Sequence, residues 1–135
     1  MSWDAWLTDD RGHSEGEWNY THNCSGRVYV VLDEAGSKLP ASTRPCRWLD
    51  RTTGEWHDAP NGHGMVSWWE HLDGMAGPEG GAFLDRIIRG LEADPERFRA
   101  MNPKNGWGDY DSFVKVLTEM RNAVPEWPST WECSG

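Results

Sequence analysis

The sequence predicts one α+β domain over residues 1–135, with a small antiparallel sheet that includes both termini and packs against three to four helices in the C-terminal half. Two observations lead to this prediction. Strand-type alternation of apolar and polar residues occurs near the two ends of the chain, whereas helix-type spacing dominates residues 66–124. Separate groups of strands and helices are typical of α+β folds. A length of 135 residues is also sufficient for one ordinary hydrophobic core.

The N-terminal part is expected to contribute two strands. Residues 2–9 alternate, so that Trp3, Ala5 and Leu7 would share one face of a strand. A turn follows at Asp-Arg-Gly, and a second short strand is expected at residues 17–21.

The middle of the chain has a weaker pattern. Residues 27–35 fit both helical and strand spacing, and their β-branched content favours a strand, but local pattern alone does not decide between the two. Residues 36–64 are rich in Gly, Pro, Thr and Asp with little periodicity. We therefore expect a long, irregular insertion at about 36–64, with a short hairpin around residues 52–54.

The C-terminal half indicates helices and a closing strand. A short helix is expected at residues 66–75, and a longer one around the apolar stripe of residues 83–91. Asp94 before Pro95 is the pattern of an N-cap followed by a first-turn proline, and Asp109 is a candidate N-cap for a last helix. The strand expected at residues 129–133 would pair with the N-terminal strand and bring the termini together.

The charge is strongly acidic and uneven. With 22 acids and 13 Lys and Arg, the chain carries −9, which argues against long nucleic acid or an anionic membrane as a partner. Residues 27–51 nevertheless carry five Lys and Arg against three acids. This basic segment is either a solvated loop or a site for a small anionic ligand, because guanidinium groups suit phosphate and carboxylate.

The cysteine content, the hydropathy and the absence of known motifs limit the cellular location and the chemistry that we expect. Three cysteines without a CxxC pair, no apolar run of membrane-spanning length and no leader-like N-terminus fit a reduced, cytoplasmic protein. There is no P-loop, GxGxxG, GxSxG or HExxH pattern, so we expect no cofactor and no metal. Ten tryptophans among 37% hydrophobic residues, at a mean hydropathy of −0.77, are an unusual way to build a core.

Two polar clusters are candidates for a functional site. The first is Asn-Tyr-Thr-His-Asn at residues 19–23, whose aromatic, amide and imidazole groups would alternate between the faces of a strand. The second is Asn-Pro-Lys-Asn-Gly-Trp-Gly-Asp-Tyr at residues 102–110, where two glycines allow close approach of the backbone. Each has a structural alternative: His22 would be an ordinary structural histidine, and the second cluster a tight turn that pins Trp107 into the core.

These clusters, with Trp-Asp-x-x-Leu-Thr at residues 3–8 and Asp-Pro-x-x-Phe-Arg at 94–99, resemble a family of small uncharacterised proteins of actinobacteria and their phages. The resemblance covers both ends of the chain but not residues 36–64. It implies a helix at 27–35, and a methionine in relatives where this chain has Arg27. It also implies a bacterial host cytoplasm, and it supplies no activity.

The leading hypothesis is a protein that binds a small polar, anionic or nucleotide-like ligand, in a phage setting as a sponge for a defence signal. One alternative is a hydrolase or lyase that acts on such a ligand, with His22 as general acid or base. Another is an inhibitor of a host protein, anchored by Trp56, Trp68, Trp69 and Trp127. A homo-oligomer stays open. The expected ligand-binding residues are Asn19, Tyr20, Thr21, His22, Asn23, Arg27, Asn105, Gly106, Trp107, Gly108 and Tyr110.

Overall fold

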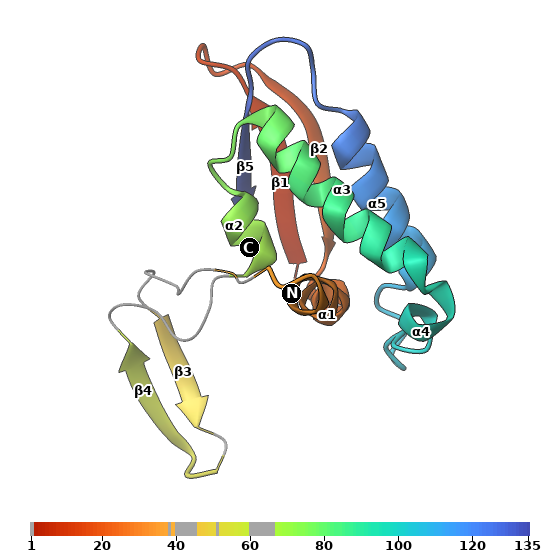
Figure 1. The fold of residues 1–135 in the computed structure, drawn as a ribbon. Helices are drawn as coiled ribbons and strands as arrows, with labels where there is room; N and C mark the ends of the chain where they lie inside the picture. Colours follow the sequence, from red (N-terminus) through yellow and green to blue (C-terminus); the bar gives the residue numbers. More distant parts are fainter. Residues whose placement is uncertain (1, 38, 40–45, 51, 60–66) are drawn as a thin grey trace.

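In the computed structural model, which describes residues 2–37, 39, 46–50, 52–59 and 67–135, helices pack on one face of a three-stranded antiparallel sheet (Figure 1). The central strand β1 (Ser2–Thr8) lies between β2 (Ser14–Thr21) and the C-terminal strand β5 (Thr130–Ser134). The predicted α+β class is therefore confirmed, with both ends of the chain in one sheet.

The register of the sheet follows from its apolar pattern. Alternate residues of β1 are fully buried, starting at Trp3, while the residues between them are half-buried. Ala5 pairs with Cys133 and Leu7 with Trp131, so the expected pairing of the terminal strands is confirmed. Because side chains alternate along a strand, this pairing directs the large Trp131 ring to the same face as the apolar side of β1.

Five α-helices are found among the described residues. The helix α1 (Ser25–Glu34) follows β2 through a short 3-10 turn, η1 (His22–Cys24). The strand favoured by the β-branched content of this segment is wrong, and the helix implied by the family resemblance is found. The helix forms because Val28, Val31 and Leu32 recur at helical spacing and are all buried, so that packing overrides local propensity.

The other helices lie in the C-terminal half, as expected. They are α2 (Trp68–Leu72), α3 (Gly77–Ala93), α4 (Pro95–Arg99) and α5 (Tyr110–Asn122). The two long helices α3 and α5 lie side by side across the sheet (Figure 1). Asp94 and Asp109 occupy the predicted N-cap positions, and Asp109 also makes the capping hydrogen bond.

The insertion contains the expected hairpin. Strands β3 (Cys46–Asp50) and β4 (Glu55–Ala59) pair around a turn that includes residues 52–54. Figure 1 shows the hairpin apart from the three-stranded sheet. Residues 38, 40–45, 51 and 60–64 of the insertion lie outside the described residues, and so do most Lys and Arg residues of the basic segment.

The described tryptophans differ widely in burial. Trp68 and Trp69 are only 0% and 4% exposed, so the expectation that they anchor a partner is wrong. The short helix α2 turns both rings into the core, where Trp68 meets Trp3 edge to face at 5.0 Å. In contrast, Trp56 is 57% exposed and Trp107 is 68% exposed.

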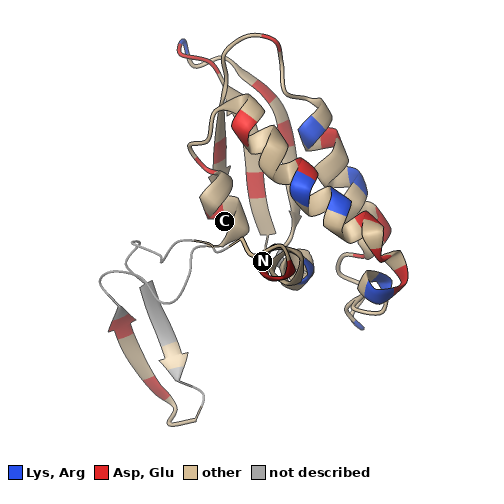
Figure 2. Cartoon of the chain, in the orientation of Figure 1, with Lys and Arg blue, Asp and Glu red and all other residues tan. Residues whose placement is uncertain are grey.

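The charges also divide by element. Strands β1, β2 and β5 carry acidic residues but no Lys or Arg, whereas the Lys and Arg side chains that the structure describes lie on helices and connections (Figure 2). Asp4 and Glu132 alternate with the buried residues of β1 and β5, so both carboxylates lie on the side of the sheet that the helices leave uncovered. None of the described helices is both long and apolar enough to cross a membrane.

Candidate functional site

The two polar clusters meet where β2 ends beside the loop that leads into α5. The Tyr20 hydroxyl accepts a hydrogen bond from the backbone N–H of Asp109 at 3.1 Å and lies 3.3 Å from the Asp109 carbonyl, to which it donates. The Asn23 side-chain amide donates to the carbonyl of Trp107 at 3.2 Å. Residues more than 80 positions apart in the sequence are thus fixed against each other.

A polar groove of about 470 Å³ lies at this junction. Five of the expected ligand-binding residues line it. The full lining consists of Ser2, Asn19, Tyr20, Thr21, Trp107, Gly108, Asp109 and Ser112. The exposed indole of Trp107 is part of this lining, so the alternative in which the turn pins Trp107 into the core is wrong.

The glycines on either side of Trp107 determine where its ring lies. Gly106 and Gly108 have positive φ angles of 74° and 89°, which other residues rarely adopt. At Gly108 a Cβ atom would lie 2.5 Å from Cγ2 of Thr21, so only glycine lets the loop pass this close to β2. The Asn105 side-chain oxygen accepts from the Trp107 N–H at 3.0 Å and closes the turn.

The start of α5 has its own protein partners. The Asp109 carboxylate accepts from the backbone N–H of Ser112 at 2.8 Å and from its hydroxyl at 3.0 Å. The Asn102 side-chain oxygen accepts from the N–H of Tyr110 at 2.9 Å. The helix start therefore offers little to an anion, because protein groups already occupy these donors.

Two expected ligand-binding residues have other roles in the fold. Arg27 is 1% exposed, and its guanidinium donates to the Phe98 carbonyl at 2.9 Å and to the Asn102 side chain at 2.5 Å. The buried Tyr110 donates its hydroxyl to the Leu91 carbonyl at 2.8 Å. Neither side chain lines the groove. Arg27 holds the segment before α5 in position, and Tyr110 ties the start of α5 to α3.

The groove leaves polar atoms for a ligand. The amide nitrogen of Asn19 is within hydrogen-bond distance of three acceptors on β1, at Ser2, Trp3 and Asp4. The side-chain carbonyl oxygen of Asn19 has no hydrogen-bond partner among the described residues. Burial raises the pKa of Tyr20, so that its hydroxyl stays protonated near neutral pH and acts as a hydrogen-bonding group rather than a base.

Three residues of the groove were not predicted from the sequence, and the prediction for His22 concerns a side chain that the structure does not describe. Ser2, Asp109 and Ser112 line the groove but were not expected there. The spacing of Asp109 and Ser112, an N-cap and its third helical residue, could have indicated one of these contacts. The backbone of His22 lies in η1, but its side chain is outside the described structure, so the proposed acid–base role has no geometry to support it.

No group of three or more His, Cys, Asp or Glu side chains in the described part of the chain is placed to hold a metal ion. Comparisons with family models, curated proteins and solved structures find no significant match.

Proposed function

We propose that the groove binds a small polar ligand with a flat, nucleoside-like ring that stacks on the indole of Trp107. The observation that carries this proposal is the exposed indole at a polar groove, held there by two glycines with positive φ. A base stacked on an aromatic side chain contributes about 1–3 kcal/mol. The turn contact of Asn105 and the two glycines hold Trp107 at the groove, so little of this energy is lost in fixing the ring.

The polar lining supports recognition of the edges of such a ring. The free carbonyl oxygen of Asn19 can accept a hydrogen bond, and the hydroxyl of Ser2 can both donate and accept. Amide and hydroxyl groups of this kind read the donor and acceptor pattern of a heterocycle. The groove would therefore select ligands by their ring edges as well as by stacking.

The charge around the groove favours the ring over a phosphate. Within the described residues, no Lys or Arg lines the groove, and Asp109 contributes a carboxylate. The neighbouring strands are also acidic (Figure 2). If the ligand is a nucleotide, its phosphate would point out of the groove into solvent.

In this proposal the protein is a binding protein, and it would sequester a signalling nucleotide if it acts as a sponge in a phage-infected cell. The sponge role is supported only by the family resemblance. The enzyme alternative is distinguished by incubating each ligand that binds with the protein and analysing it by chromatography. Recovery of unchanged ligand supports the binding protein, and a new product supports the enzyme.

The binding test is isothermal titration calorimetry with the four common ribonucleosides and their 5′-monophosphates. Trp107→Ala should weaken binding by roughly 5- to 150-fold, the equivalent of the stacking energy. Trp56→Ala is the matched control, because it removes an exposed indole from the hairpin, outside the groove lining. The proposal fails if no nucleoside binds, if both variants lose affinity equally, or if the phosphate group provides most of the affinity.

A further inference from the structure

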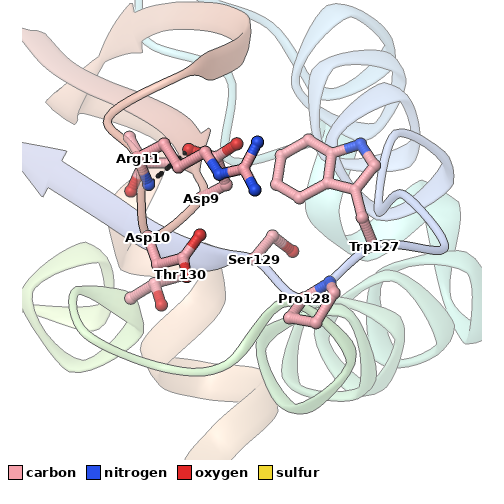
Figure 3. Close-up of a pocket in the computed structure, with 8 residues that line it drawn as sticks. Asp9, Asp10, Arg11, Trp127, Pro128, Ser129 and Thr130 are labelled. Carbon is pink, nitrogen blue, oxygen red and sulfur yellow. Dashed lines mark hydrogen bonds between the residues drawn. The ribbon is translucent and has the colours of Figure 1, made fainter.

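A second hollow, of about 450 Å³, lies at the opposite end of β1 from the groove (Figure 3). Its lining comes from the β1–β2 connection and from the segment that leads into β5. The lining residues are Thr8, Asp9, Asp10, Arg11, Trp127, Pro128, Ser129 and Thr130. Along the seven residues of β1, the two sites are separated by about 20 Å.

One charged group of this hollow is used by the fold. The Asp9 carboxylate accepts from the backbone N–H of Arg11 at 2.9 Å and of His13 at 2.8 Å. Its second oxygen lies 3.1 Å from Nδ1 of His13. These contacts close the β1–β2 turn and fix the positions of the residues that follow Asp9.

The side chains of Asp10 and Arg11 do not stabilise the turn in this way. Within the described part of the chain, the Asp10 carboxylate and the Arg11 guanidinium have no hydrogen bond or ion pair. Figure 3 shows the Arg11 guanidinium pointing toward the Trp127 indole, while Asp10 lies beside Thr130. A positive group, a negative group and a half-buried aromatic ring thus surround one space.

We propose that this hollow binds a small zwitterion with a flat side group, of the aromatic α-amino acid type. The ligand carboxylate would pair with the Arg11 guanidinium, whose planar fork matches carboxylate geometry. The ligand ammonium would pair with the Asp10 carboxylate, and the flat group would pack on Trp127 and Pro128. The hollow is within the size range of small-molecule sites, roughly 300–1,000 Å³.

The opposite charges of Asp10 and Arg11 define the ligand class. A simple anion would be drawn to Arg11 but repelled by the two neighbouring aspartates. A simple cation would be drawn to Asp10 but repelled by Arg11. A ligand that carries both charges satisfies both groups, so the site should discriminate against analogues that lack either charge.

Three probes test this inference by saturation-transfer NMR and calorimetry: phenylalanine, phenylacetate and phenethylamine. Phenylalanine should bind, and the two singly charged analogues should bind roughly tenfold more weakly or not at all. Arg11→Gln and Asp10→Asn should each weaken phenylalanine binding by roughly tenfold or more. Lys115→Gln and Glu119→Gln are matched controls, because both change an exposed charge on α5 outside the hollow and should leave binding unchanged.

Arg11→Gln and Asp10→Asn each change an exposed side chain without described partners, so the thermal unfolding of both variants should match that of the wild-type protein. The inference is overturned if phenylalanine does not bind, if phenylacetate or phenethylamine binds equally well, or if Arg11→Gln and Asp10→Asn keep full affinity. Nucleoside binding should be unchanged in Arg11→Gln, since the groove at Trp107 is at the other end of β1. The two proposals can therefore fail separately.

Discussion

The hydroxyl of Tyr20 is a single group whose removal should weaken the contact between the two motifs. In Tyr20→Phe the ring keeps its stacking on Phe113, at a centroid distance of 5.6 Å, while the hydroxyl is lost. Both bonds to the backbone of Asp109 disappear, and the Asp109 N–H is left without its partner. The change therefore tests one hydrogen-bonded contact with little effect on packing.

The expected loss follows from those two bonds. A neutral hydrogen bond contributes about 0.5–1.5 kcal/mol net, and a partly buried donor left unpaired costs about 1–3 kcal/mol. Both bonds are at the long end of the usual range, and Tyr20 is only half-buried. We therefore expect Tyr20→Phe to lower the free energy of unfolding by about 1–2 kcal/mol.

Urea unfolding measures this loss, and hydrogen exchange locates it. Backbone amides at the start of α5 should exchange faster in Tyr20→Phe, whereas those in the middle of α3 should follow only the global change. Tyr29→Phe is the control, since its hydroxyl accepts from the Trp68 N–H at the start of α2 instead of linking the motifs. A loss below about 0.5 kcal/mol in Tyr20→Phe, with unchanged exchange at α5, would refute this account of the contact.

Three further predictions concern the glycines beside Trp107, the buried Arg27 and the thiol of Cys133. Gly106→Ala should lower the free energy of unfolding in urea by about 1–2 kcal/mol, because alanine is strained at the positive φ of this position. Gly108→Ala should lower it clearly more, because its Cβ would also meet Thr21. Equal losses in the two variants would contradict the close approach of the loop to β2. Arg27→Met should destabilise the fold by about 2–4 kcal/mol in urea unfolding, because two acceptors lose a charged donor. Burial raises the pKa of the Cys133 thiol to about 12, so the folded state binds its proton more tightly than the unfolded chain. Stability should fall as pH rises from about 9 to about 12, by up to about 4 kcal/mol, and the urea midpoint of Cys133→Ala should fall less over this range.

Much of the fold is predictable because its periodic segments coincide with buried faces. Alternation in β1 and the apolar stripe of α3 each have one buried side, so local pattern and tertiary structure agree. The segment at 27–35 is the exception, since its valines suit a strand as well as a helix. The neighbouring surface to which they pack decides between the two, and a short sequence does not contain that information.

The site was predictable only in part, for a similar reason. Hydrogen-bonding composition indicated both motifs, but not that Tyr20 and Asp109 join them. Arg27 looks like an anion-binding residue until the structure shows its guanidinium enclosed by carbonyl and amide oxygens. The sequence predicts only a turn at Asp10 and Arg11, because the tertiary structure is what brings Trp127 beside them.

The central claim is that Trp107 stacks on the ring of a bound ligand. The most direct measurement is a titration of ¹⁵N-labelled protein with the tightest-binding nucleoside, following the ten indole N–H signals and assigning Trp107 by its absence in Trp107→Ala. We predict that the Trp107 signal shifts most and saturates with the calorimetric Kd, while Trp56 is unmoved. A Trp107 signal that stays in place while the ligand binds would contradict the claim.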